Sequence, residues 1–80
     1  MTFGDFKNEI ARVIENRPKS WRKGQAVFNY IESKYGVARA VQFEDGIDCF
    51  YRDDQIEEFL QKAYERIKYI LSIFVVKNKD

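Results

Sequence analysis

The stretch DDQIEEFLQKAYERIKYILSIFVV, residues 53–76, decides the fold of this 80-residue chain. Asp54 followed by Glu57 is typical of a helix N-terminus with a capping box. Behind this start, apolar side chains recur at steps of three and four residues, the spacing that places them on one stripe of an α-helix. They are Ile56, Phe59, Leu60, Ala63, Tyr64, Ile67, Ile70, Leu71 and Phe74. We therefore predict a helix over residues 54–74.

This helix is long for so small a protein. At about 1.5 Å per residue it measures roughly 35 Å. The radius of gyration of a compact chain of this length is only about 12 Å. We expect the far end of the helix to overhang the rest of the protein, to bend, or to find a partner.

Two further helices precede it. Thr2 and Asp5 form another capping-box pattern, which predicts a helix over residues 2–16 that ends before Pro18, because proline disfavours helical geometry at the preceding residue. A second helix is predicted over residues 20–35, with Ser20 as its N-cap. Gly36 follows as the residue that closes it.

Residues 37–43 fit either a short helical turn or a short strand. We favour the turn, because Val37, Ala40 and Val41 lie at three- and four-residue spacing. A strand would need a partner, and only residues 73–76 have the β-branched character to supply one. The sequence thus predicts a single all-α domain over residues 1–80, a small bundle of three main helices with a short helical turn between the second and the third.

Composition limits the function. The net charge of +1 creates no overall field that would gather nucleic acid or an anionic membrane. The longest apolar stretch, residues 69–76, is too short to span a bilayer, and no signal-peptide pattern is present. A single cysteine fits a reducing compartment. We expect a cytoplasmic protein that makes no use of a membrane.

The absence of histidine argues against an enzyme. It removes the commonest general base, and with one cysteine no Cys/His zinc set can form within one chain. The charge is uneven, since residues 43–60 hold seven acids and one cation. We interpret their aspartates as helix caps and solvated loop positions, and Cys49 as a small buried filler. These aspartates are Asp45, Asp48, Asp53 and Asp54. We predict no catalytic residue, no metal and no cofactor.

A basic loop surrounds the only tryptophan. The segment RPKSWRKGQ, residues 17–25, carries four cations, and a ring among cations is typical of a phosphate-contacting patch that stacks on bases. The alternative is that Trp21 turns into the core and the cations merely flank it. The candidate nucleic-acid patch is Arg17, Lys19, Trp21, Arg22 and Lys23.

A polar row follows on the second helix. Arg22, Gln25 and Asn29 lie at i, i+3 and i+7 and so share one face. Such a row either recognises a partner or ties this helix to the loop of residues 45–54, and we favour the tie. Gly24 in the first turn costs helix stability and suggests the close approach of another segment.

Residues 17–60 resemble a group of small uncharacterised bacterial and phage-type proteins. The resemblance rests on the R-x-G-Q-x-x-F-N segment at residues 22–29 and the D-x-F-Y-x-D box at residues 48–53. Cys49 stands where the group's pattern has proline. The resemblance implies a compact helical domain in which the two boxes pair, and it implies no reaction.

The end of the long helix is apolar nearly all round. A helix that is apolar on every side must be covered on every side, and two short helices in a small monomer can cover one stripe. We therefore predict a protein-interaction or assembly module, a homodimer, with the nucleic-acid patch as the alternative. A final strand or an engulfed helix end would remove the need for a partner. The predicted interface is Tyr69, Ile70, Ile73, Phe74, Val75 and Val76.

Overall fold

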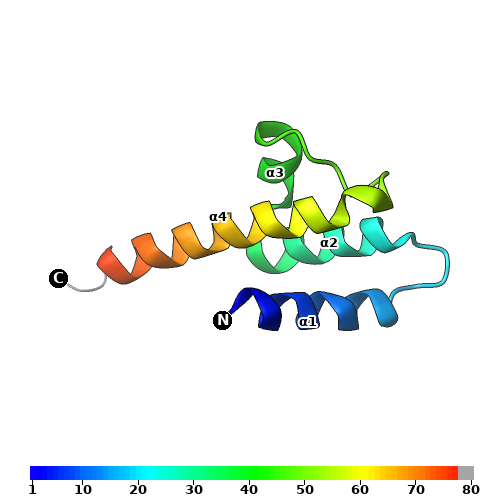
Figure 1. Ribbon diagram of the computed structural model, residues 1–80, viewed down its shortest axis with the longest axis horizontal. Helices are drawn as coiled ribbons and strands as arrows, with labels where there is room; N and C mark the ends of the chain where they lie inside the picture. Colours follow the sequence, from blue (N-terminus) through cyan, green and yellow to red (C-terminus); the bar gives the residue numbers. More distant parts are fainter. Residues whose placement is uncertain (78–80) are drawn as a thin grey trace.

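The computed structural model describes residues 1–77, and side chains as far as residue 73. The described chain contains no strand, which confirms the all-α prediction. It has four α-helices and one 3-10 turn (Figure 1), one α-helix more than the three main ones predicted. These are α1 (Phe3–Glu15), α2 (Lys23–Tyr35), α3 (Ala38–Glu44), η1 (Asp53–Gln55) and α4 (Ile56–Lys77).

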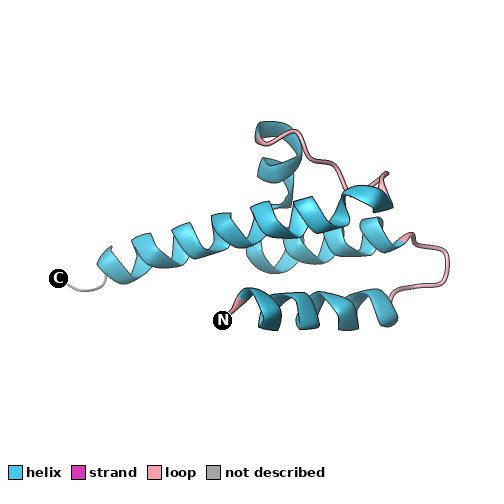
Figure 2. Ribbon diagram, in the orientation of Figure 1, coloured by secondary structure: helices cyan, strands magenta, loops and turns pink. Residues whose placement is uncertain are grey.

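The helices surround one core. α1 and α2 run in opposite directions, and α4 packs on both while running in the same direction as α2 (Figure 1). α3 packs on α2 and α4. Figure 2 shows residues 16–22 at the end of the molecule where α2 begins, and residues 45–52 running from the end of α3 to the 3-10 turn before α4.

The start of α1 is as predicted. The backbone N–H of Asp5 donates to Thr2 Oγ1 at 3.0 Å, and the N–H of Thr2 donates to Asp5 Oδ2 at 3.2 Å. These two bonds satisfy backbone donors that the first turn leaves unpaired. At the other end, α1 stops one residue before the predicted Asn16.

The prediction that Ser20 caps the second helix is wrong. α2 begins at Lys23, and its N-cap position is Arg22, whose side chain makes no capping bond. The reason is a turn in the connection: the N–H of Trp21 donates to the carbonyl of Pro18 at 3.0 Å. The end of α2 is as predicted, because Gly36 adopts the left-handed conformation at φ 71° and its N–H bonds back to α2.

The uncertain segment 37–43 is helical, and the strand alternative is wrong. α3 spans seven residues, and residues 73–76 continue α4, so they form no strand with it. The prediction that a capping box at Asp54 begins the long helix is wrong. That region starts with η1, and the Asp54 carboxylate pairs with the Arg52 guanidinium at 3.3 Å.

The core draws on every α-helix and on the 45–52 loop. Its fully buried side chains with the largest volumes come from α1, α2, α3, the loop and α4. Since α3 supplies Val41 and the loop supplies Cys49, both segments are fixed parts of the domain. These fully buried residues are Phe6, Ile10, Val27, Ile31, Val41, Cys49 and Phe59.

Candidate interaction surface

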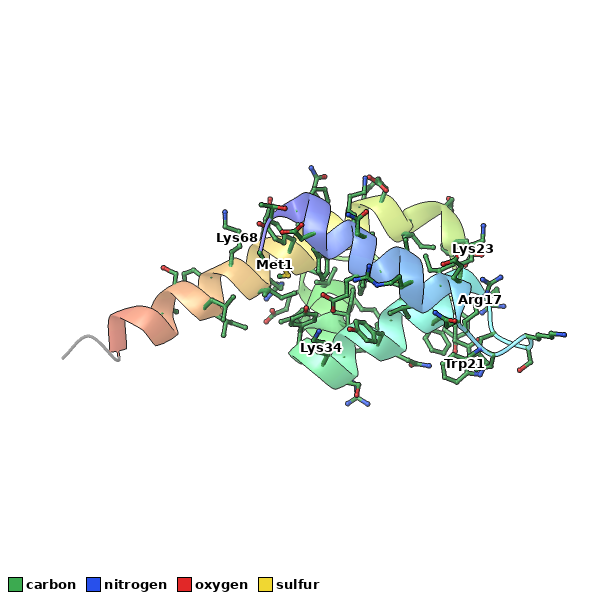
Figure 3. The ribbon with its side chains drawn as sticks, turned by 90° about the horizontal axis from the view of Figure 1, so that it is seen from below. Met1, Arg17, Trp21, Lys23, Lys34 and Lys68 are labelled. Carbon is green, nitrogen blue, oxygen red and sulfur yellow. The ribbon has the colours of Figure 1, made fainter. Side chains whose placement is uncertain are left out.

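The far half of α4 leaves the bundle. The molecule is 47 Å long but only 25 Å and 19 Å across. Figure 3 shows the excess length as a single helix that projects beyond Met1 and Lys68. Ile67 is 4% exposed, whereas Ile70, one turn further along the same stripe, is 51% exposed. Thus the expected overhang is present, and it begins just after Ile67.

The projecting helix presents a continuous apolar surface. We call its described part the tail face and define it as Tyr69, Ile70, Leu71 and Ile73, which are 67%, 51%, 52% and 43% exposed. No charged residue occurs between Tyr69 and Val76. Leu71 was missing from the predicted interface, although its exposure is close to that of Ile70. Phe74, Val75 and Val76, also predicted for the interface, lie outside the residues whose side chains the structure describes.

A groove between α3 and α4 adjoins the tail face. It has a volume of about 380 Å³, and Val37, Ala40, Tyr69 and Ile70 line it. The charged groups on its walls include two pairs, Lys62 with Glu65 on α4 and Arg66 with residues at the end of α3. The apolar surface therefore continues from the tail into the bundle.

Arg66 fixes α3 against α4 at this groove. Its Nε donates to Asp45 Oδ2 at 2.9 Å, and its Nη2 contacts Asp45 Oδ1 at 3.2 Å and Glu44 Oε2 at 3.0 Å. The hydrogen bonds from Arg66 lower the pKa of Asp45. Because the guanidinium is engaged within the chain, it holds the groove in shape.

The basic loop lies at the end of the molecule opposite the tail (Figure 3). Arg17 has a structural role, since its Nη1 donates to the carbonyl of Ile14 at 2.8 Å and its Nε to that of Trp21 at 3.0 Å. Lys19 and Lys23 are exposed, and Trp21 is half-buried. The loop is thus held by Arg17, while its two lysines face solvent.

Helix α2 is tied to the 45–52 loop and η1, as favoured for the polar row, but of that row Arg22 alone makes the tie, and Gly24 adds a second bond. Arg22 Nη2 donates to the carbonyl of Phe50 at 3.3 Å, and the N–H of Gly24 donates to Asp53 Oδ1 at 2.9 Å. A Cβ on Gly24 would lie 1.7 Å from the carbonyl oxygen of Cys49, which confirms the expected close approach. The side chains of Gln25 and Asn29 form no hydrogen bond among the described residues.

The four aspartates of the acidic segment all have partners inside the chain. Asp45 and Asp54 pair with arginines, and Asp53 accepts from Gly24. Asp48 accepts from the N–H of Phe50 at 2.9 Å. The described residues hold no cluster of three or more acids or cysteines that could bind a metal ion.

Cys49 is fully buried. Burial first, and then the nearby Asp48, raise the pKa of its thiol to about 12. Its Sγ lies 3.4 Å from the carbonyl oxygen of Gly24, to which it donates. A protonated and covered thiol has no nucleophilic character, which agrees with the interpretation of Cys49 as a filler.

One half-buried acid with several hydrogen-bond partners was not predicted. Glu9 lies between α1 and α2, where it accepts hydrogen bonds from Tyr30 at 2.6 Å, Lys34 at 2.9 Å and Tyr35 at 2.9 Å. Burial raises its pKa, but the three hydrogen bonds together outweigh burial and lower the pKa. The available signal was that Glu9 falls beside Phe6 on the apolar stripe of α1, where an acid needs partners.

Comparison with known proteins adds no identification. No family model, curated protein or solved structure matches this chain. The resemblance to the bacterial and phage-type group therefore stays a prediction, although its two boxes are in contact here. No described helix has both the length and the hydropathy needed to cross a bilayer.

Proposed function

We propose that this protein is a small assembly module that pairs with a second copy of itself through the tail face of α4. We assign it no reaction. The observation that carries the proposal is the tail face itself: four large apolar side chains, each at least 43% exposed, on a helix that extends past the bundle.

Self-association is the simplest way to cover this surface. A two-fold dimer uses the same patch on both subunits, so one self-complementary patch is sufficient. The tail is uncharged from Tyr69 to Val76, and two such helices can pack without opposing like charges along that length. Toward the bundle, the Lys68 ammonium lies 5.5 Å from the centre of the Tyr64 ring of its own chain. Lys62 and Arg66, further along α4, are paired with acids of their own chain.

The size of the patch predicts a weak dimer. Covering the exposed half of one large apolar side chain contributes roughly 1 kcal/mol, or about 8 kcal/mol for the tail faces of two protomers. Association costs about 4–15 kcal/mol in lost freedom. At the lower end of that cost the net gain is about 4 kcal/mol, which corresponds to a dissociation constant of about 1 mM.

A pair of matched variants tests the proposal. Ile70→Glu combined with Ile73→Glu places charges in the tail face, whereas Ser72→Glu places one on the polar stripe of the same turn. In light scattering coupled to gel filtration, the first variant should elute as a 9.6 kDa monomer, while the Ser72 variant should retain the apparent mass of the native protein. Circular dichroism checks that both remain helical. Equal masses for all three proteins at every concentration would refute the proposal.

Nucleic-acid association through the basic loop is the second candidate. One observation favours it: none of Arg17, Lys19, Arg22 and Lys23 pairs with a carboxylate among the described residues, so the loop keeps its positive charge. A combined Lys19→Glu and Lys23→Glu variant should lose salt-sensitive retention on immobilised single-stranded DNA. Lys68→Glu, at the other end of the molecule, is the control. Retention that does not depend on salt in the native protein would exclude this candidate.

A further inference from the structure

The two most exposed aromatic side chains of the described chain lie together. Phe43 at the end of α3 is 78% exposed, and Tyr51 in the 45–52 loop is 68% exposed. Both line a hollow of about 370 Å³, within the range of about 300–1,000 Å³ typical of ligand pockets. We call it the aromatic hollow; its residues are Phe28, Arg39, Gln42, Phe43, Phe50 and Tyr51.

The hollow is formed in advance of any binding. Phe28 and Phe50 meet edge to face at 5.5 Å between ring centroids, and Phe50 meets Tyr51 at 4.7 Å. Asp48 holds this loop, because its Oδ1 accepts from the N–H of Phe50 at 2.9 Å and from Gln42 Nε2 at 3.2 Å. A partner would therefore lose little free energy in ordering the site.

The rim of the hollow is positively charged, although the surrounding sequence is acidic. Arg39 lines the hollow, and the Cζ of Arg22 lies 5.5 Å from the centre of the Tyr51 ring. Neither arginine forms a salt bridge within the described part of the chain. Of the acids nearby, Glu44 pairs with Arg66 and Asp54 with Arg52, whereas Asp48 accepts hydrogen bonds from Gln42 and Phe50 of the hollow itself.

We propose that the aromatic hollow binds a peptide segment of another protein that presents a large apolar side chain next to carboxylates. Exposed aromatic rings and arginines are the residues that dominate binding energy at protein interfaces. The Arg39 guanidinium, which forms no salt bridge among the described residues, complements a carboxylate in a bidentate manner, and Arg22 keeps further N–H donors beside its bond to Phe50. A single-stranded nucleic acid also stacks on aromatic rings, but its continuous phosphate chain needs a groove lined with cations, and Arg39 is the only described cation that lines the hollow, while Arg22 lies beside Tyr51.

Selection from a random peptide library tests this site. A phage-displayed library of random dodecapeptides is panned against the Ile70→Glu, Ile73→Glu protein, so that self-association through the tail plays no part. The selected peptides should carry Phe, Trp, Leu or Tyr within a few residues of Asp or Glu. Their synthetic, fluorescently labelled forms are then titrated with the protein and followed by anisotropy.

Two variants locate the binding. Phe43→Ser and Arg39→Ala should each weaken the peptides at least tenfold, and Arg39→Lys should recover part of the loss. Both positions are exposed, so circular dichroism should show an unchanged fold. Lys19→Ala, an equal loss of charge outside the hollow, should have no effect. The proposal is overturned if no peptide is enriched, if the enriched peptides are basic, or if single-stranded DNA displaces them from the hollow. It is equally overturned if both variants bind the peptides as tightly as their parent.

Discussion

Replacement of Gly24 by alanine should strongly destabilise the protein. On an exposed helix this change is favourable by about 1 kcal/mol, because alanine has the higher helix propensity. Here the new Cβ would lie 1.7 Å from the carbonyl oxygen of Cys49 and 2.9 Å from Asp53 Oδ1. The first contact is with backbone, so the loop must move away from α2.

The size of the effect follows from what that movement breaks. Overpacking in a closed site costs about 1–3 kcal/mol. The displacement also stretches the 2.9 Å hydrogen bond from the Gly24 N–H to Asp53, and a bond to a charged group is worth about 1.5–3 kcal/mol. After the gain in helix propensity, Gly24→Ala should cost about 2–5 kcal/mol, out of a total stability of about 4–12 kcal/mol for a chain of this length.

Urea unfolding followed by far-UV circular dichroism measures this cost. Gly4→Ala is the matched control, since its Cβ meets only Thr2 Oγ1 at 3.7 Å and should leave stability equal or raised by up to about 1 kcal/mol. Asp53→Ala removes the hydrogen bond without the clash and should fall between the two. If Gly24→Ala unfolds at the same urea concentration as the native protein, the contact between α2 and the loop is not as described.

The other predictions concern the core, the Cys49 thiol and the half-buried Glu9 carboxylate. Phe59→Ala should cost about 3–5 kcal/mol in urea unfolding because it leaves a cavity at a fully buried position, and an unchanged midpoint would show that α4 is not packed as described. Cys49 should resist a thiol reagent at pH 8 in the native protein and react once urea is added; rapid native labelling would contradict its burial. The folded thiol binds its proton more tightly than the unfolded one, so Cys49 should make stability fall between about pH 9 and 12, and Cys49→Ala should flatten that fall. The pH dependence from Glu9 has the opposite sign. Its lowered pKa supports stability above about pH 4.5, and this contribution is lost as the pH falls further. The loss of stability in acid should be weaker in Glu9→Gln, and an equal loss in both proteins would disprove the hydrogen-bonded cluster.

The sequence predicted the features of the fold that depend on neighbouring residues. Helical periodicity located α1, α2 and α4, and the Thr2 and Gly36 signals located two helix ends. These signals are local, so no knowledge of packing was needed. An overhang was one of the three outcomes expected for so long a helix, beside a bend and a partner, and the long axis of the molecule shows it.

Features that depend on distant contacts were predicted less well. Ser20 looked like an N-cap, but the turn closed by Pro18 and held by Arg17 moves the start of α2 to Lys23. The exposure of Leu71 depends on where the other helices stop, which its position on the stripe does not reveal.

The aromatic hollow depends on contacts of the same kind. It joins residues of α2, α3 and the 45–52 loop, which come together only in the folded chain. Nothing in the sequence distinguishes Phe43 and Tyr51 from the aromatic residues of the core. The acidic composition of residues 43–60 also gives no indication that arginines lie beside the hollow.

The central claim is that two copies of the protein associate through the tail of α4. Sedimentation equilibrium of the unmodified protein tests this claim most directly. Centrifugation from low micromolar to about 1 mM spans the range in which an association of roughly 4–8 kcal/mol is half complete. We predict a weight-average mass that rises from 9.6 kDa toward twice that value as the concentration increases. A mass that stays at 9.6 kDa up to the highest concentration would contradict the account.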